Sequence, residues 1–533
     1  MRRSGRRIGT AGLVLVGAVL LSLIVFGAIL GPGRALRIAA ASVLSTAIDG
    51  IAEDPGGHRI PVIDVRVDHA YLDTLNADLP WSGDHRVPAT VVHSGIHHNV
   101  KFRYRGAYTP SHFLGGKKSF RITTKKNGPF APYRKLNLIN PKALNMLTNH
   151  LGNWIAGRMG VAVPYNEMVF VRMNGRDHGV MEMFEQIDGS FERIRGVATD
   201  DVPVYRGEFP PVQGRELPKH RQLWRNAAHW EYTSDADSTL AHDRLNALVA
   251  VIGSATMDLR LRRDSLAKLI DVDAYLRFMA AVLVVNTKHM DQYHNQWLVM
   301  RPDGRFYPVW WDALLMFAPK DEPLYYIHDA LSFWILQVPE WRLQRDRYAY
   351  EALVELHTAG AFTRQLDRTI ERVQPSVLAD RNKYGNVSLA PEDVHRFSVV
   401  HVIGSLSGMR TSVAAYWDRT LQRLRANEVN VVRKQDVRIT SSSEAAIRLY
   451  WTEGESESKE VYVNGEYLNP EWNGKECTFV LHRTVKLPEG AWNRPFINWE
   501  HFLVEPLDVT ITFPRGVPSD LRITNAVTDE AIP

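Results

Sequence analysis

Alternating hydrophobic and polar residues predict a β-rich region near the start of the chain. A period of two, which is typical of half-buried strands, occurs in IPVIDVRV (60–67), VKFRYR (100–105) and KSFRIT (118–123). Two more alternating runs flank Asn174-Gly175 within residues 168–184, and this dipeptide favours a tight hairpin turn. Residues 141–159 instead carry leucines at helical spacing after an initial proline. We therefore expect a sheet of about five strands with one inserted helix.

Beyond residue 200 the apolar residues follow the helical period. Residues 272–285 (VDAYLRFMAAVLVV) are long and apolar enough for a buried helix, and Asp271 or Asp273 stands where a cap or a first-turn acid is favourable. Further helical stretches are residues 334–356, 366–379 and 408–426. Alternation returns in residues 435–440, 446–451, 460–468, 477–482 and 507–513. This last part predicts a terminal β domain of about 100 residues, a sandwich or a barrel.

An apolar segment without ionisable side chains, residues 8–31, follows Arg2, Arg3, Arg6 and Arg7. As a helix it would be ~36 Å long, enough to cross the ~30 Å hydrocarbon layer of a membrane. The positive-inside rule keeps the arginines in the cytoplasm and places the bulk of the chain outside. We therefore expect an uncleaved, single-pass signal anchor in the cell membrane. A signal peptide cleaved near residues 39–42 is the main alternative, and a twin-arginine signal is a further one.

The net charge suggests a nucleic-acid partner until the charges are located. The chain has 64 Lys+Arg against 59 Asp+Glu, a net charge of +5. Six of the basic residues lie within residues 1–40, which contain no acid, so the remainder carries 58 basic and 59 acidic residues. No nucleic-acid partner is therefore expected. Hydrophobic residues at 45% and charged residues at 23% exclude a disordered or multi-span membrane protein. Cys477 is the only cysteine, which excludes an intramolecular disulfide.

The most informative polar residues follow the predicted buried helix. Asp291 and Asn295 stand four residues apart in a predicted loop, and a hairpin turning at residues 302–304 returns the chain to Asp312. Mg²⁺ prefers oxygen ligands from one or two side chains together with phosphate oxygens. A further carboxylate can orient an attacking hydroxyl or accept its proton. A capped turn explains any one of these residues better, but together, after a sheet and then helices, they predict a phosphotransfer site.

Several stretches of the chain match, in order, the motifs of a known family. They are IPVIDV (60–65), RYRGAYT (103–109), KKSFRI (117–122), RMG (158–160), VFVRMNGRDHGVMEMFEQID (169–188) and the segment 269–317. Over residues 58–425 the chain thereby resembles the spore coat protein H (CotH) kinase-like family, atypical members of the protein kinase fold. The resemblance implies an α+β, bilobal kinase-like fold with a β-rich N-lobe and a helical C-lobe. The predicted order is a basic tail and anchor (1–40), a linker (41–58), the N-lobe (59–190), the C-lobe (191–428) and a β-sandwich-like domain (429–533).

The resemblance also implies roles for residues of the N-lobe. Lys118 matches the lysine that binds the nucleotide phosphates, and strand alternation places the neighbouring Lys117 on the opposite face. Arg105-Gly106 matches the turn that covers the phosphates. Glu185 matches the connector between the lobes, which lines the adenine pocket through backbone groups; a salt bridge at the end of a strand is the alternative for this residue.

In the C-lobe, the resemblance implies that Asp291 is the catalytic-loop aspartate and that Asn295 and Asp312 hold the metal. Two features depart from ordinary protein kinases. Residues 142–159 contain no acid to pair with the lysine, so Asn149 or an acid from elsewhere, such as Glu182, would take that place. Met290 stands where ordinary kinases have arginine, and Asn295 follows Asp291 by four residues rather than five. A different loop or reduced activity would follow.

These observations predict a membrane-anchored, extracytoplasmic kinase. It would transfer a phosphoryl group from ATP, with Mg²⁺ or Mn²⁺, to Ser or Thr hydroxyls of an envelope or surface protein, with Lys118 and Asp291 as its catalytic residues. ATP is normally scarce outside the cytoplasmic membrane, which keeps two alternatives open. One is a catalytically silent kinase-like scaffold in cell-envelope or surface-polysaccharide assembly. The other is a transferase of the same fold that acts on a surface polysaccharide.

Overall fold

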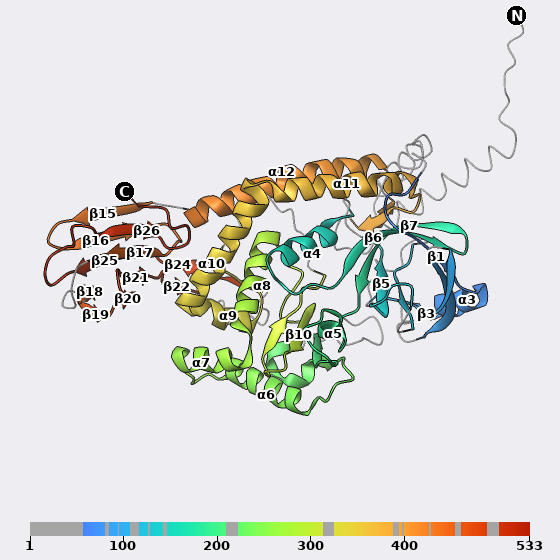
Figure 1. The fold of residues 1–533 in the computed structure, drawn as a ribbon, viewed down its shortest axis with the longest axis horizontal. Helices are drawn as coiled ribbons and strands as arrows, with labels where there is room; N and C mark the ends of the chain where they lie inside the picture. The colour runs from blue at the N-terminus through green and yellow to red at the C-terminus, as the bar shows by residue number, and fades with distance from the viewer. Residues whose placement is uncertain are drawn as a thin grey trace, which may run out of the picture. The chain divides into compact units, whose positions relative to one another are not determined.

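The computed structural model describes residues 57–532, except residues 80–84, 94, 107–116, 126–127, 142–145, 209–221, 313–323, 387–393, 397–398, 426–427, 453–459 and 488–499. The described residues form an α+β structure, as predicted, with β sheets at the C-terminal end (Figure 1). The predicted membrane segment, residues 8–31, and most of the predicted linker lie outside the described residues. Within the described ranges, no helix combines the length and apolar character needed to cross a membrane.

The chain forms two compact units, and each is described by itself. Unit 1 comprises the described residues up to Leu147 together with Glu167–Phe184 and Thr369–Gly408. Unit 2 comprises Thr148–Asn166, Glu185–Arg368 and Met409–Pro533. Residues 369–408 thus belong to unit 1, although they lie within the range predicted for the C-lobe. Helices α11 (Ala361–Ala379) and α12 (Val399–Arg425) have residues in both units.

Unit 1 is built around a closed barrel whose strand order is β1-β2-β3-β4-β5-β7-β6. The strands are β1 (Val62–Arg66), β2 (Val87–His93), β3 (Ile96–Tyr104), β4 (Phe120–Thr123), β5 (Lys135–Ile139), β6 (Asn166–Met173) and β7 (Arg176–Glu185). Parallel pairing of β1 with β6 closes the ring, so the barrel has no open edge. Phe102 and Phe120 are fully buried, with ring centroids 5.0 Å apart. Helix α3 (His69–Ala77) follows β1, and β13 (Tyr384–Asn386) pairs with β14 (Val394–Arg396).

The predicted hairpin at Asn174-Gly175 is confirmed. β6 and β7 are neighbours in the barrel, and the two turn residues have φ values of 52° and 76°. Both residues lie in the left-handed region, as the tight turn that suits twisted strands requires. The Asn174 side chain also accepts a hydrogen bond from the Val67 N–H over 2.8 Å and donates one to the Val67 carbonyl over 2.7 Å. The turn is therefore tied to the end of β1.

Unit 2 contains most of the helices and a four-stranded sheet of order β11-β10-β8-β9. The helices are α4 (Thr148–Arg158), α5 (Phe191–Ile194), α6 (Thr239–Gly253), α7 (Leu259–Leu269), α8 (Val272–Val285), α9 (Ala330–Gln337) and α10 (Pro339–Leu353). The strands are β8 (Val204–Gly207), β9 (Glu231–Tyr232), β10 (Gln296–Met300) and β11 (Phe306–Pro308). Helix α8 coincides with the predicted buried helix and packs against α4 and α10.

The single helix predicted over residues 334–356 is wrong. Two helices occupy this range, because α9 ends at Gln337 and α10 begins at Pro339. Proline lacks the N–H that a continuing helix needs and its ring excludes the preceding turn, whereas the first position of a new helix suits it. The helical period alone did not reveal this break.

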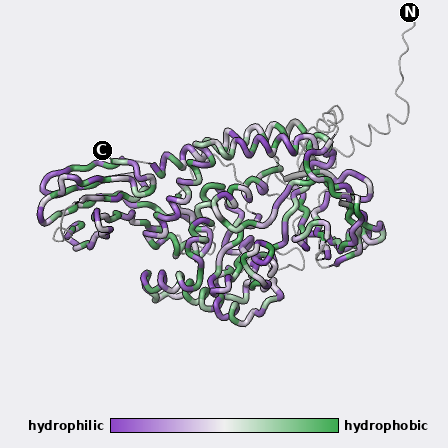
Figure 2. Tube along the Cα trace, in the orientation of Figure 1, coloured by the Kyte–Doolittle hydropathy of each residue, from purple (hydrophilic) through white to green (hydrophobic). Residues whose placement is uncertain are grey.

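The C-terminal β domain belongs to unit 2 and consists of two main sheets. One has the order β15-β16-β25-β18-β19 and the other β20-β21-β17-β26. Their strands are β15 (Val429–Arg433), β16 (Val437–Ser441), β17 (Ile447–Trp451), β18 (Val461–Val463), β19 (Glu466–Leu468), β20 (Glu471–Trp472), β21 (Cys477–Leu481), β25 (Leu507–Thr512) and β26 (Arg522–Asn525). Both sheets contribute to one hydrophobic core around Trp451, and hydrophobic and hydrophilic residues alternate along the strands (Figure 2).

Two short strand pairs extend the C-terminal domain. β22 (Val485–Lys486) pairs with β24 (Leu503–Val504). β12 (Tyr326–Ile327), which precedes α9 in the helical part of unit 2, pairs with β23 (Glu500–His501). The alternating pattern did not predict these pairs, because two residues are too few to show a period.

Candidate active site

The loop that carries the candidate site begins at an anchored helix end. Asn286 terminates α8 in the left-handed conformation, with φ 52°. Two buried side chains of α12 bind the last carbonyls of α8: the Tyr416 hydroxyl donates to Leu283 over 2.7 Å, and Trp417 Nε1 donates to Val284 over 2.8 Å. These bonds satisfy carbonyl groups that a helix end otherwise leaves unpaired. The loop therefore starts from a fixed point.

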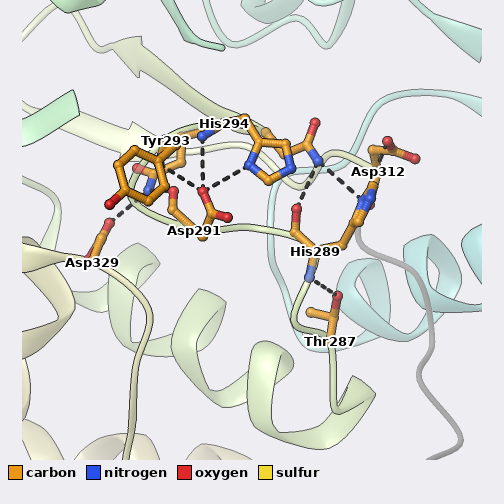
Figure 3. A network of polar contacts seen from close by, with 9 residues as sticks. Thr287, His289, Asp291, Tyr293, His294, Asp312 and Asp329 are labelled. Carbon is orange, nitrogen blue, oxygen red and sulfur yellow. Dashed lines mark hydrogen bonds and ion pairs between the residues drawn. The ribbon is translucent and has the colours of Figure 1, made fainter. Parts of the chain in front are cut away.

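Asp291 holds this loop in shape through one of its two carboxylate oxygens. Its Oδ1 accepts the backbone N–H groups of Tyr293, over 2.7 Å, and of His294, over 3.1 Å. His294 Nδ1 donates to the same oxygen over 2.8 Å (Figure 3). The carboxylate is 14% exposed, and no bond to its Oδ2 occurs among the described residues. One oxygen is thus structural, and the other remains able to accept a hydrogen bond.

His294 carries its proton more firmly than an ordinary histidine. Burial by itself lowers its pKa, but the hydrogen bond and charge of Asp291 oppose this, and the charges of Glu208 and Asp312 add to them. The net effect raises the pKa of His294. Since the charge of Asp312 contributes to this shift, Asp291 and Asp312 both act on the same imidazole ring.

Asn295 and Asp312 meet at His289. Asn295 Nδ2 donates to the His289 carbonyl over 2.8 Å. His289 Nδ1 lies 2.6 Å from the Asp312 carbonyl oxygen and 3.1 Å from Asn295 Nδ2. That nitrogen cannot donate to the first and accept from the second, so we assign its proton to the shorter contact, with Asp312. Figure 3 shows His289 beside Asp312.

The donor set of Asn295 and Asp312 fits a hard divalent cation. Because the Asn295 amide nitrogen is committed to His289, its oxygen remains as a ligand, and Asp312 adds a carboxylate. No group of three or more His, Cys, Asp or Glu side chains placed for a metal occurs in the described part of the chain. A Mg²⁺ held by two side-chain oxygens relies on phosphate oxygens and water for its other ligands. Asn295 and Asp312 alone would therefore hold such a cation only with further ligands from water or from a bound molecule.

Both predicted metal ligands have a left-handed backbone. Asn295 has φ 59° and Asp312 has φ 46°. Asn and Asp adopt this conformation more readily than other residues apart from glycine. The residue types at these two positions therefore suit the backbone of the loop.

Further polar groups bind the backbone of Asp291. Gln296 Nε2 donates to the Asp291 carbonyl over 2.5 Å and to Asp329 Oδ2 over 3.0 Å. Asp329 also accepts Trp224 Nε1 over 2.8 Å, and its other oxygen caps α9 by accepting the Ser332 N–H over 2.7 Å. We did not single out Gln296 or Asp329 from the sequence. An Asp three residues before a Ser, just ahead of an apolar run, is the cap signal that could have revealed Asp329.

In unit 1, the two neighbouring lysines have different environments, as strand alternation predicts. Lys118 is partly buried, and its ammonium donates to Asn76 Oδ1 over 2.8 Å. Lys117 is fully buried and lies 2.7 Å from Asp380 Oδ2. Burial lowers the pKa of the Lys117 ammonium, and the charge of Asp380 opposes this effect. The partner that Lys118 has in the structure is thus the amide of Asn76 rather than Asn149 or Glu182, and the buried ion pair of this strand joins Lys117 to Asp380.

Asp380 follows the last residue of α11 and is fully enclosed. Its Oδ2 accepts the Val180 N–H over 2.9 Å in addition to Lys117, and its Oδ1 accepts the Asn382 N–H over 2.7 Å. A Cβ added at Gly179 would lie 2.3 Å from Oδ1. The absence of a side chain at Gly179 therefore makes room for the carboxylate. Nothing in the spacing along the sequence connects Asp380 with Lys117, because 263 positions separate them.

The remaining predicted site residues take part in ordinary local contacts. The Glu185 carboxylate is buried, binds Arg195 over 2.7 Å and accepts the Tyr165 N–H over 3.0 Å. This salt bridge is the alternative that the sequence left open for the side chain, and the backbone role of Glu185 stays a prediction. Arg105 donates its N–H to the Ser119 carbonyl over 3.0 Å. The turn that continues from Gly106 lies outside the described residues.

The structure thus brings together Asp291, Asn295 and Asp312, all in unit 2. The predicted residues Arg105, Gly106 and Lys118 belong to unit 1. Their assigned roles stay predictions, as do the roles assigned to the three residues of unit 2.

A comparison with models of protein families shows to which family the chain with this site belongs. The family described as CotH kinase protein matches residues 102–425, more than half of the chain. This chain belongs to the CotH kinase family. The resemblance noted from the motifs is thereby confirmed, and membership supports a kinase-like protein. The matched region contains both lysines, Asp380 and the three residues of the candidate site, but it ends before the C-terminal β domain.

A distant relative supports the same assignment to the CotH family. Inner spore coat protein H of Bacillus subtilis (strain 168) is 22% identical over 339 residues, which cover 62% of this chain and 91% of that protein. Almost the whole relative is thus matched, while a large part of this chain lies outside the match.

Proposed function

We propose that this CotH-family chain is an extracytoplasmic, membrane-anchored kinase. It transfers a phosphoryl group from ATP, with Mg²⁺ or Mn²⁺, to a Ser or Thr hydroxyl of an envelope or surface protein. The observation that carries the proposal is that Asp291 and Asn295 share one loop and that Asp312 contacts the same loop at His289. One Asp291 oxygen is tied by three N–H donors, while no bond to the other occurs among the described residues. Family membership supports the kinase class of reaction.

In this proposal Asp291 orients the acceptor hydroxyl and takes its proton through Oδ2. The hydroxyl oxygen forms a bond to the γ-phosphorus as the bond from that phosphorus to the leaving oxygen of ADP breaks. Asn295 Oδ1 and the Asp312 carboxylate hold the divalent cation, which when bound neutralises negative charge on the phosphates. The three N–H bonds to Oδ1 keep the carboxylate from turning, so catalysis comes mainly from positioning.

For the nucleotide phosphates we propose Lys118, as the resemblance implies. Its ammonium is partly buried and donates to Asn76 Oδ1 over 2.8 Å, whereas Lys117 is fully buried in its ion pair with Asp380. Lys118→Met is the informative variant, because Lys118 is partly exposed and its loss leaves no buried acid behind. An Lys118→Met protein that binds ATP as the parent does would remove this role from Lys118.

The first test is thermal stabilisation of the purified protein by ATP with Mg²⁺ or Mn²⁺. We expect a metal-dependent rise in melting temperature for the parent protein and none for Asp312→Ala. Asp303→Ala, which removes an acid from the exposed hairpin turn, is the matched control and should behave like the parent. Failure of the parent protein to respond to any metal–ATP mixture would remove the nucleotide from the proposal. Label transfer from ATP to an envelope extract then identifies the acceptor.

A scaffold role is the second candidate, and one feature favours it. The C-terminal domain lies outside the matched family region and exposes Tyr467 (57%), Leu468 (38%) and Trp472 (41%) on β19 and β20. Exposed aromatic residues often mark binding surfaces. A protein that binds envelope polymer without transferring label from ATP would favour this candidate over the kinase.

A further inference from the structure

The chain between the Asp312 loop and α9 is paired with the C-terminal domain. β12 runs antiparallel to β23, with Tyr326 opposite His501 and Ile327 opposite Glu500. One residue further, the Phe502 N–H donates to the Tyr325 carbonyl over 3.1 Å. Backbone groups of the C-terminal domain thus bind the segment that precedes α9 in the helical part of unit 2. Both partners belong to unit 2.

Phe502 anchors this pairing. Its side chain is 4% exposed and stacks on Phe333 of α9, with ring centroids 5.6 Å apart and an interplanar angle of 24°. The next residue, Leu503, is 51% exposed. One aromatic side chain is therefore inserted against α9, while its neighbour faces away.

Buried polar contacts hold the other side of the same segment. The Tyr325 hydroxyl donates to Asp346 Oδ2 over 2.8 Å, and Arg345 Nη1 donates to the Leu324 carbonyl over 2.9 Å. Arg342, on the same helix α10, donates to the Arg483 carbonyl of the C-terminal domain over 2.6 Å. Buried charged groups need such specific partners. Helix α10 therefore binds both residues 324–325 and the C-terminal domain through specific polar contacts.

Two contacts lead from β12 to the loop of Asp291. The Lys288 ammonium lies 4.8 Å from the centroid of the Tyr326 ring, and Lys288 directly precedes His289. Asp329, two residues after β12, accepts Gln296 Nε2, which also donates to the Asp291 carbonyl. A displacement of β12 would therefore change contacts at both ends of the Asp291 loop, at Lys288 and at Gln296.

We propose that the C-terminal β domain is a positioning element of the candidate site. Strand β23 and Phe502 hold residues 324–329, and these hold the Asp291 loop through Tyr326 and Asp329. This inference goes beyond the kinase proposal and does not depend on it, because it concerns the shape of the loop whatever the loop does. The domain lies outside the matched CotH region.

Hydrogen–deuterium exchange of the full chain tests the proposal with Phe502→Ala and, as a matched control, Leu503→Ala. Amide protection reports local opening, and the N–H groups of Tyr293 and His294 report on Asp291 directly. We expect Phe502→Ala to speed exchange about tenfold or more both in residues 324–329 and in residues 286–296. Leu503→Ala should leave both segments as in the parent, and the barrel strand β1 should be unchanged in all proteins.

Faster exchange in residues 324–329 with unchanged exchange in residues 286–296 would overturn the proposal. Should Phe502→Ala fail to fold, Tyr326→Phe and Tyr326→Ala serve instead. The alanine removes the ring over Lys288, while phenylalanine keeps it. We then expect faster exchange in residues 286–296 for the alanine variant alone, and equal exchange in the two variants contradicts the proposal. Since neither readout uses ATP, an absence of kinase activity leaves this test intact.

Discussion

Two aspartates of this protein each accept three hydrogen bonds, and they differ in how these are distributed. Asp380 in unit 1 is fully buried and accepts hydrogen bonds through both carboxylate oxygens. Its Oδ2 binds Lys117 and Val180, and its Oδ1 binds Asn382. Asp291 in unit 2 is 14% exposed and receives all of its donors on Oδ1. The protein thus satisfies the first carboxylate completely and the second only on one side.

The difference separates a structural charge from one that the kinase proposal assigns to catalysis. A buried carboxylate needs partners for all its acceptor sites, because an unpaired buried charge is very costly. A carboxylate near the surface that is held rigidly by one oxygen can offer the other to a substrate. Removal of Asp380 should therefore affect stability most, and removal of the Asp291 charge should affect activity most.

The largest expected effect on stability is that of Asp380→Ala. This change leaves Lys117 buried without its acid, and we expect a loss of about 3–5 kcal/mol in the free energy of unfolding, measured by chemical denaturation. Asp367→Ala on the same helix, α11, breaks an ion pair whose acid is 53% exposed, and should cost at most about 1 kcal/mol. Equal losses in the two variants would contradict a structural role for Asp380. The double variant Lys117→Met/Asp380→Ala should lose less than Asp380→Ala alone.

Asp291→Asn tests the other half of the comparison. The amide oxygen can still accept the N–H groups of the loop, but the charge that stabilises protonated His294 is lost, so we expect a loss of about 1 kcal/mol in the free energy of unfolding. The amide cannot accept the proton of a hydroxyl, so label transfer from ATP should fall about 10²-fold or more. Asp303→Asn in the exposed turn should leave both quantities unchanged. Persisting label transfer by Asp291→Asn would show that another group positions the acceptor.

The smallest expected effect concerns how the free energy of unfolding depends on pH. His178, near Asp380, and His294, which binds Asp291, should change it with opposite signs. Burial lowers the pKa of His178, in the surroundings of Lys117 and Asp380, to about 4. The folded state therefore resists its protonation, and stability is lost as the pH falls from about 6.5 toward 4. The pKa of His294 is raised, so its stabilisation is complete below about pH 6.5 and is lost as the pH rises through the folded value.

Unfolding free energies of His178→Gln and His294→Gln between pH 4 and pH 8 check these signs. At the acidic end of this range, His178→Gln should be more stable than the parent. His294→Gln should be less stable than the parent, and the difference should be largest at the acidic end. Parallel curves for the two variants would mean that the surroundings of the two aspartates do not differ in the way that we describe.

Much of the fold follows from local patterns in the chain. The hairpin at Asn174-Gly175 and helix α8 were predicted at or close to their observed positions, because turn chemistry and a long apolar period are local properties. Strand β5 was missed because its alternating run, KLNL (135–138), is only four residues long and the strand ends in two consecutive apolar residues. The break at Pro339 was missed because the helical period continues across it.

The candidate site divides in the same way. Asp291, Asn295 and Asp312 lie within one short segment, so their spacing and a family resemblance were enough to propose them together. His294 and Gln296 were passed over because a single histidine or glutamine in a loop carries no signal of its own. Asp380 was missed because its partner Lys117 is far away in the chain, whereas Asp329 carried a local cap signal that was not used. The preference for Lys118 over Lys117 rested on motif alignment, which contains no information on burial.

By itself, the sequence determined the elements with a clear period, the family and the short segment that holds the candidate site. Only the tertiary structure decided which lysine is buried with an acid and that the C-terminal domain pairs with the chain next to the site. The physical reason is distance along the chain. Periodicity and turn preference act over a few neighbouring residues, whereas burial and ion pairing depend on groups that folding brings together from hundreds of positions apart.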